Sequence, residues 1–268
     1  MSDAEKRKLD GDTTLSEFVY NTTMKSILEL LDVAWKMHDS VGTEKRFEQP
    51  RIETIRQAVK GPCQCDGLWL KCALDVLSRN SINRYAFADA LRMALVKGRG
   101  KHRNIMLSGP ADCAKPFLIQ PITEVFPETF CNPSSSSFSW IGVEECTVIW
   151  LNDYRWAPKR NGGNIEWDAL LRLLEGGVTN LPAPMNAFTK HIRVVRDTPI
   201  FATSLAMLRW WNINPDENIT ARHKKENDMM ESRWRHFELT YKFKEEEKVT
   251  DIPKCQKCFA ELVLLGDC

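Results

Sequence analysis

The chain has 268 residues, of which 37 are Lys or Arg and 36 are Asp or Glu, so its formal net charge is +1. Apolar residues make up 43% of the chain, which is the composition of an ordinary globular protein. This composition excludes a disordered tail, a collagen-like chain and a small disulfide scaffold. The near-zero charge also excludes binding of nucleic acid through general basicity, so any such binding has to come from local patches.

The N-terminal residues and the lengths of the apolar runs indicate whether the protein is secreted or membrane-bound. Residues 1–12 are charged rather than apolar and do not form a secretory signal. No apolar run approaches the ~18 residues that a membrane span needs. We therefore expect no membrane association and a nuclear or cytoplasmic protein that is not secreted. In that setting its nine cysteines are expected to be reduced.

The first hundred residues show helical patterning after a flexible arm at residues 1–13. Helices are predicted over residues 14–38, 52–59, 68–77 and 85–96. Gly98 is expected to stop the last of them. We predict an all-helical N-terminal unit over residues 1–100, with a role in oligomerisation.

The pattern changes after residue 97, where short apolar runs begin to alternate with helical ones. Strands are predicted over residues 104–108, 147–151, 198–204 and 236–243, with helices over residues 117–125 and 167–174. This alternation favours an α/β fold with a mainly parallel sheet covered on both faces. We assign this α/β domain to residues 101–243, and a C-terminal tail follows it at residues 244–268.

A basic run at residues 97–103 precedes the first predicted strand. Such a run is usually a solvated loop, and that is the expectation here. The alternative is that its lysines and arginines contact the phosphates of a nucleic acid.

The turn after the first strand matches most of the phosphate-loop template G-x-x-x-x-G-K-[ST]. In that template backbone N–H groups cradle phosphate oxygens, the lysine reaches the terminal phosphates, and the hydroxyl ligates Mg²⁺. The loop residues are Gly109, Pro110, Ala111, Asp112, Cys113, Ala114, Lys115 and Pro116. Ala114 replaces the second glycine and Pro116 replaces the hydroxyl residue. The alternative is a plain strand-to-helix turn with Lys115 on the surface.

With the segments that follow it, this loop resembles the helicase domain of superfamily III. This is the AAA+-related, P-loop NTPase-like ATPase domain of small DNA virus replication proteins such as the parvovirus non-structural replication initiator, and of virus-derived cellular copies. The resemblance covers roughly residues 67–243, with its motifs in the family's order. It implies an ATPase that uses ATP and Mg²⁺, acts on single-stranded DNA and assembles as a homo-oligomeric ring.

Two segments resemble the parts of this family that handle the nucleotide. Residues 148–153 resemble the Walker B strand, whose usual ending is a pair of acidic residues. Asn152 replaces the first acid, so the resemblance leaves Asp153 alone to hold Mg²⁺ or polarise water. Residues 199–204 resemble the strand whose last polar residue senses the γ-phosphate, a role that would fall to Ser204 or Thr203 because Leu205 replaces the usual Asn.

Two further segments resemble the parts that contact DNA and the neighbouring subunit. Residues 171–190 resemble a stretch that ends in a DNA-binding hairpin. The resemblance implies that Lys190, with the adjacent His191, contacts single-stranded DNA. Residues 230–237 resemble the segment that places an arginine near a neighbour's nucleotide. The resemblance implies that Arg233 is this catalytic arginine, with Arg235 as the second choice.

These substitutions leave two functions open. The first is an ATP-dependent, helicase-like domain of a DNA replication initiator. The second is a catalytically weak pseudo-ATPase that serves as an oligomeric nucleic-acid-binding or scaffold protein. Ala114, Pro116 and Asn152 favour the second, because metal placement supplies much of this catalysis.

The C-terminal tail carries a C-x-x-C motif at Cys255 and Cys258. We expect two reduced cysteines on a terminal helix or turn. The alternative is half of a tetrahedral zinc site, completed by Cys63 and Cys65 or by Cys268, in a zinc-dependent interaction protein.

Overall fold

The computed structural model describes residues 20–31, 33–34, 49–133, 139–157, 165–183, 191–210, 219–249 and 251–267. The chain divides into two compact units, Met1–Gln49 and Pro50–Cys268. In the first unit residues 24–31 are helical, which confirms part of the helix predicted over residues 14–38, but residues 22–23 are not helical and interrupt it. The arm predicted at residues 1–13 lies outside the described residues.

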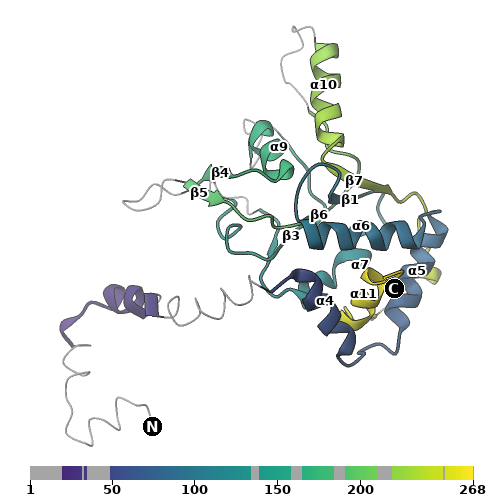
Figure 1. Ribbon diagram of the computed structural model, residues 1–268, viewed down its shortest axis with the longest axis horizontal. Helices are drawn as coiled ribbons and strands as arrows, with labels where there is room; N and C mark the ends of the chain where they lie inside the picture. Colours follow the sequence, from purple (N-terminus) through teal and green to yellow (C-terminus); the bar gives the residue numbers. More distant parts are fainter. Residues whose placement is uncertain are drawn as a thin grey trace, which may run out of the picture. The chain divides into compact units, whose positions relative to one another are not determined.

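The second unit is built on a five-stranded sheet with the order β2-β3-β6-β1-β7 (Figure 1). Its strands are β1 (Asn104–Ser108), β2 (Thr129–Cys131), β3 (Val148–Leu151), β6 (Ile200–Ser204) and β7 (Trp234–Glu238). Every neighbouring pair runs parallel. All residues of β1, β3 and β6 are buried, as expected for strands covered on both faces. The predicted α/β class with a mainly parallel sheet is confirmed.

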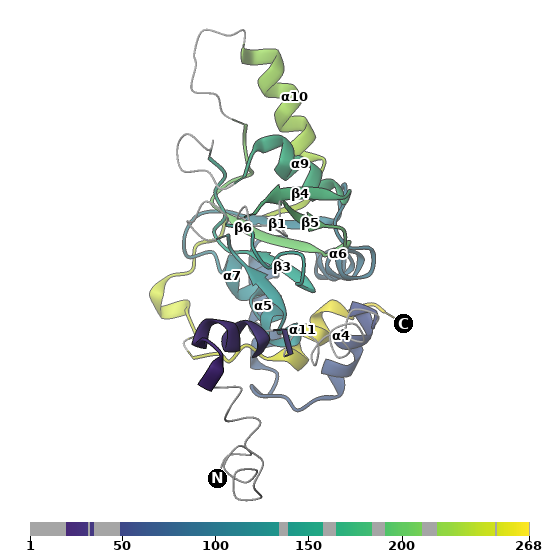
Figure 2. The same cartoon turned by 90° about the vertical axis from the view of Figure 1, so that its left-hand side faces the viewer.

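Different elements cover the two faces of the sheet, as Figure 2 shows. One face carries α4 (Arg51–Lys60), α5 (Leu68–Arg79), α6 (Arg84–Lys97), α7 (Lys115–Ile119), α8 (Ile122–Val125) and α11 (Gln256–Val263). The other carries α9 (Trp167–Glu175), α10 (Ile219–Glu231) and the antiparallel hairpin of β4 (Thr179–Pro182) and β5 (His191–Val194). A short 3₁₀ turn, η2 (Glu245–Glu247), lies between β7 and α11.

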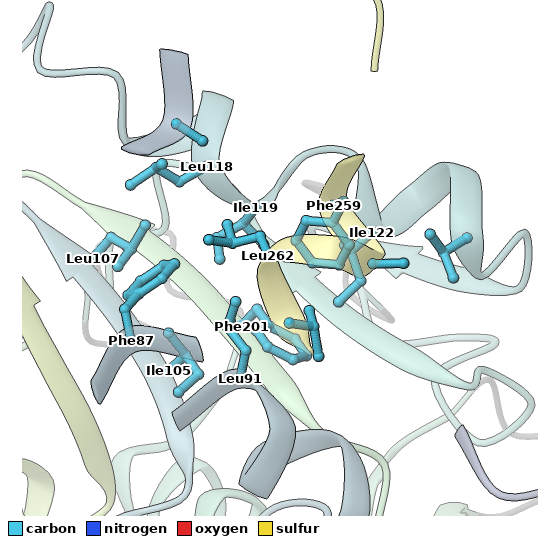
Figure 3. Packing of buried hydrophobic residues seen from close by; sticks show 14 of the residues in the cluster. Phe87, Leu91, Ile105, Leu107, Leu118, Ile119, Ile122, Phe201, Phe259 and Leu262 are labelled. Atoms are coloured by element: carbon cyan, nitrogen blue, oxygen red, sulfur yellow. The ribbon is translucent and has the colours of Figure 1, made fainter. Parts of the chain in front are cut away.

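Alternating side chains of β1 separate the two cores. Ile105 and Leu107 point into the core beneath α6, α7 and α11, while Met106 points into the core beneath α9 and α10. Figure 3 shows the first core, where Phe259 of α11 lies among side chains of α7, α8 and the sheet. Helices α4–α6 and α11 therefore share one core with the sheet. The boundaries that the sequence suggests at residues 100 and 243 stay predictions.

Helices α4, α5 and α6 confirm the three predicted helices that precede the sheet. Asn83 caps α6, because its side chain accepts hydrogen bonds from the backbone N–H groups of Tyr85 and Ala86. The single helix predicted over residues 117–125 is instead two short helices, α7 and α8. The break falls at Pro121, which has no N–H to continue the helical ladder.

Arg99 corrects the expectation that residues 97–103 form a solvated loop. Its side chain is fully buried and lies at the base of the β4–β5 hairpin. The guanidinium donates to the backbone oxygens of Leu173, Gly177, Val194 and Arg196 at 2.8–3.3 Å. Burial lowers the pKa of Arg99 from its ordinary value. This side chain therefore joins the end of α9, the hairpin and the start of β1, and it is not free to bind phosphate.

In the part of the chain that the structure describes, no helix has both the length and the apolar character needed to cross a bilayer.

Candidate nucleotide-binding site

The loop after β1 lies where the sheet topology opens a crevice. The chain leaves β1 for α7 on one face, and it leaves the adjacent strand β6 for α10 on the other face. In parallel α/β sheets, ligands bind outside the carboxyl ends of two such strands. The N–H of Gly109 donates to the backbone oxygen of Ser204 at 3.3 Å, so the loop and the end of β6 are in contact. Ser204, which was predicted to sense phosphate, is buried at this point.

Gly109 begins the loop at a position where the backbone of Leu239 leaves no room for a side chain. Its φ is +149°, and a Cβ built there would lie 2.0 Å from the backbone oxygen of Leu239. That residue follows β7, and its own N–H donates to the oxygen of Ser108 at 2.7 Å. The glycine therefore lets the chain after β7 pass against the start of the loop.

Gly109→Ala is expected to destabilise the protein by about 2–4 kcal/mol, because a backbone carbonyl cannot move aside as a flexible side chain can. Urea unfolding of the purified variant measures the loss. Gly177→Ala is the matched control, since a Cβ there would meet nothing within 4 Å. Equal stability of the two variants would contradict this account of Gly109.

The loop turns through two left-handed residues, Asp112 at φ +63° and Ala114 at φ +61°. The position of the template's second glycine is therefore one where glycine is favoured, and Ala114 holds it at a cost of about 1 kcal/mol. Among the described residues, no acceptor is found for the backbone N–H groups of residues 111–114. A run of such donors is the arrangement that binds phosphate oxygens.

Lys115 is buried, with 8% of its surface exposed, so the alternative of a surface lysine is wrong. Its Nζ folds back into the loop and donates to the backbone oxygens of Gly109, at 2.6 Å, and Pro110. It also lies 3.3 Å from the Sγ of Cys113. Within the described part of the chain no carboxylate forms an ion pair with this ammonium group. The positive charge is therefore held inside the loop by dipoles alone.

A cavity of about 460 Å³ adjoins the loop. Ala114 and Pro116 line it from the loop side, and Val76 of α5 and Phe243 line it from elsewhere in the fold. Lys248 and Asp112 also line it, and the Lys248 ammonium pairs with the Asp112 carboxylate at 3.1 Å. The cavity has the size of a small-molecule site.

Asp153 follows β3, so it lies at the same edge of the sheet as the loop. Its backbone N–H donates to the Thr203 hydroxyl at 2.8 Å, and that hydroxyl donates to the side-chain oxygen of Asn152 at 2.9 Å. The Asp153 carboxylate pairs with Arg155 at 3.0 Å and is largely exposed. Thr203 thus holds the end of β3 to β6, while the one acid of the predicted Walker B motif has an arginine partner.

The side chain of Arg233 forms hydrogen bonds and an ion pair within this chain. It is buried, donates to the backbone oxygens of Leu171, at 3.0 Å, and Met229, and pairs with Glu175 at 3.2 Å. These are partners within this chain, and the role of Arg233 at a neighbour's nucleotide stays a prediction. Arg235, the second choice, is exposed.

The hairpin implied by the resemblance is present as the β4–β5 pair. Lys190, its predicted DNA contact, lies outside the described residues. His191 begins β5 and is exposed, as is Arg193. Both residues lie on the outward face of the hairpin because Ile192 and Val194 point into the core.

His236, to which none of the predicted site motifs assigned a role, lies beside the loop. Its Nε2 is 2.7 Å from the Ser108 Oγ, at the last residue of β1. Desolvation of the ring lowers the pKa of His236 below its ordinary value. The sequence places His236 at the start of a predicted strand. A strand pattern shows on which face of the sheet a side chain lies, but it does not show which residue of the adjacent strand lies next to it.

Comparisons with known proteins add little to this geometry. No protein-family model matches the sequence, and no curated protein matches it. One similar solved structure is the JCV helicase bound to a small acetamide compound, with 13% identity and a TM-score of 0.43. The match covers 93% of this chain and 70% of that chain. That likeness is too weak to carry an argument, so the fold assignment rests on the sheet itself.

Proposed function

We propose that this chain is a P-loop NTPase-like, helicase-like domain that binds ATP at residues 109–116. The buried ammonium group of Lys115 carries this proposal. A buried charge is normally paired, and this one has only carbonyl and thiol partners among the described residues. A phosphate group in the loop would supply the missing negative charge.

The surroundings of Lys115 support a nucleotide rather than a lone anion. The N–H groups of residues 111–114 are available to phosphate oxygens. The adjoining cavity of about 460 Å³ is large enough to hold the nucleoside part of the ligand. The two features share Ala114, so one ligand would contact both.

The same site fits Mg²⁺ poorly, and this observation favours the weak-ATPase function over an efficient helicase motor. Pro116 has no hydroxyl for the metal, and Asn152 is neutral and already bonded to Thr203. The single acid, Asp153, is paired with Arg155. We therefore propose ATP binding with slow hydrolysis.

Single-stranded DNA and a homo-oligomeric ring belong to the proposal as partners that the family resemblance implies. The outward face of the β4–β5 hairpin supports the first, since His191 and Arg193 project from it. A hairpin with basic side chains on its free face can contact the phosphates of a single strand.

Lys115→Ala is expected to weaken ATP binding by about 100-fold, because it removes a charge-assisted contact worth about 3 kcal/mol. Calorimetric titration of the purified full chain with ATP, with and without Mg²⁺, measures the affinity. The matched control is Lys60→Ala, which removes an exposed lysine at the end of α4 and should leave the affinity unchanged.

Two results would contradict the proposal. One is that the parent chain binds no ATP at millimolar concentration. The other is that the parent and Lys115→Ala chains, both folded by circular dichroism, bind it equally.

A further inference from the structure

Four cysteines meet at one point although they come from opposite ends of the second unit. Cys63 and Cys65 lie between α4 and α5, while Cys255 and Cys258 lie at the start of α11. The pair Cys63 and Cys258 is separated by 195 residues in the chain. All four Sγ atoms nevertheless lie within 4.8 Å of one another.

The distances between the sulfur atoms fit a tetrahedron around one ion. Cys63 Sγ lies 3.9 Å from Cys65, 3.7 Å from Cys255 and 3.6 Å from Cys258, and Cys65 lies 3.4 Å from Cys258. Zinc–sulfur bonds of about 2.3 Å place the corners of a tetrahedron about 3.8 Å apart. Bonded disulfide sulfurs are only about 2 Å apart, and all four cysteines are free thiols in the structure.

Backbone donors already surround two of these sulfurs. The N–H of Gly67 donates to Cys63 Sγ at 3.3 Å, and the N–H of Trp69 donates to Cys65 Sγ at 3.4 Å. Such outer-shell hydrogen bonds fix the orientation of thiolate ligands and offset their negative charge. The other two sulfurs belong to fully buried residues, so water cannot solvate thiolates there.

We propose that Cys63, Cys65, Cys255 and Cys258 bind one structural zinc ion. Four thiolates with no open position are the ligand set of a structural rather than a catalytic zinc site. Mg²⁺ and Ca²⁺ prefer oxygen ligands, and an iron–sulfur cluster needs room for several metal atoms between its cysteines. Binding releases the protons of those ligands that are still thiols, so four thiolates hold the ion.

The zinc ion would join α11 to the loop between α4 and α5. Trp69 donates its backbone N–H to Cys65. The centroid of its side-chain ring lies 5.4 Å from that of Phe117 in α7 and 6.0 Å from that of Phe259 in α11. Helix α7 is the helix that follows the phosphate loop. The metal would therefore fix the C-terminal helix and support the helix that carries Lys115, without touching the nucleotide.

Elemental analysis of the full chain, purified under reducing conditions without a metal-binding tag, tests the site. About one zinc per chain is expected. Cys258→Ser should lose most of this zinc, while Cys131→Ser, which alters an exposed cysteine outside the cluster, should keep it.

A second measurement on the parent chain avoids dependence on variants that do not fold. Titration with an organic mercurial should release the zinc to a coloured chelator as four thiols react. Uptake of Co²⁺ by the stripped chain should give the intense visible absorption of a tetrahedral thiolate complex. Less than about 0.1 zinc per chain with no uptake of added Zn²⁺ would overturn the proposal. Unchanged zinc in folded Cys258→Ser, iron in place of zinc, or a disulfide among these cysteines would also overturn it.

Discussion

The triple variant Ala114→Gly, Pro116→Thr and Asn152→Glu is expected to hydrolyse ATP about 100-fold faster than the parent chain. A correctly held metal ion stabilises the charge of the transition state by several kcal/mol, and each 1.4 kcal/mol is a factor of about ten in rate. The parent chain lacks two of the groups that would place the metal, so restoring them should recover part of that stabilisation.

Each change suits its local structure. Position 114 has a φ of +61°, which glycine adopts without strain. Position 116 lies in the first turn of α7, where threonine is tolerated and can present a hydroxyl. At position 152 a glutamate oxygen can accept the hydrogen bond from Thr203 that the Asn152 side chain now accepts. None of the three should therefore disrupt the fold.

Phosphate release by the purified chains, with and without single-stranded DNA, measures the effect. Adding Lys115→Ala to the triple variant is the control and should remove the gain, because it takes away the charge-assisted contact to the nucleotide and weakens its binding about 100-fold. A folded triple variant that hydrolyses ATP no faster than the parent would count against the helicase-like assignment. It would leave the zinc proposal untouched, since the cysteine cluster is separate from the loop.

Arg99→Met is expected to lower the free energy of unfolding by about 3 kcal/mol or more. The guanidinium satisfies four backbone oxygens at a fully buried position. Methionine fills part of the space but leaves these oxygens without a donor, and each buried unsatisfied group costs about 1–3 kcal/mol. Arg99→Lys should also destabilise, since a single ammonium group cannot reproduce the planar fork of donors.

Urea unfolding followed by circular dichroism measures this loss as a lower midpoint at an unchanged slope. Arg56→Met is the control. Arg56 forms ion pairs with Glu53 and Asp267 on the surface, where such pairs contribute about 0–1 kcal/mol. If Arg99→Met were as stable as the control, Arg99 would not be the structural anchor of the hairpin.

The sequence by itself determined the elements whose patterns are local. The runs that form β1, β3 and β6 are continuous and apolar because both faces of these strands are buried. Helices α4 to α6 followed from periodicity, and the end of α6 followed from the local stop signal of Gly98. The spacing of Gly109 and Lys115 located the loop, because loop chemistry depends on neighbours in the chain.

Only the tertiary structure decided the roles of residues whose partners are distant in sequence. The sequence predicted a solvated loop around Arg99 and a role at a neighbour's nucleotide for Arg233, but backbone oxygens more than sixty residues away accept hydrogen bonds from both. The sequence offered Cys63 and Cys65 only as one alternative for completing the C-x-x-C motif, and the tertiary structure decided it by placing α11 beside α5. A local pattern records which face of a segment is apolar. It does not record which other segment will cover that face, because strand order and crossovers decide that.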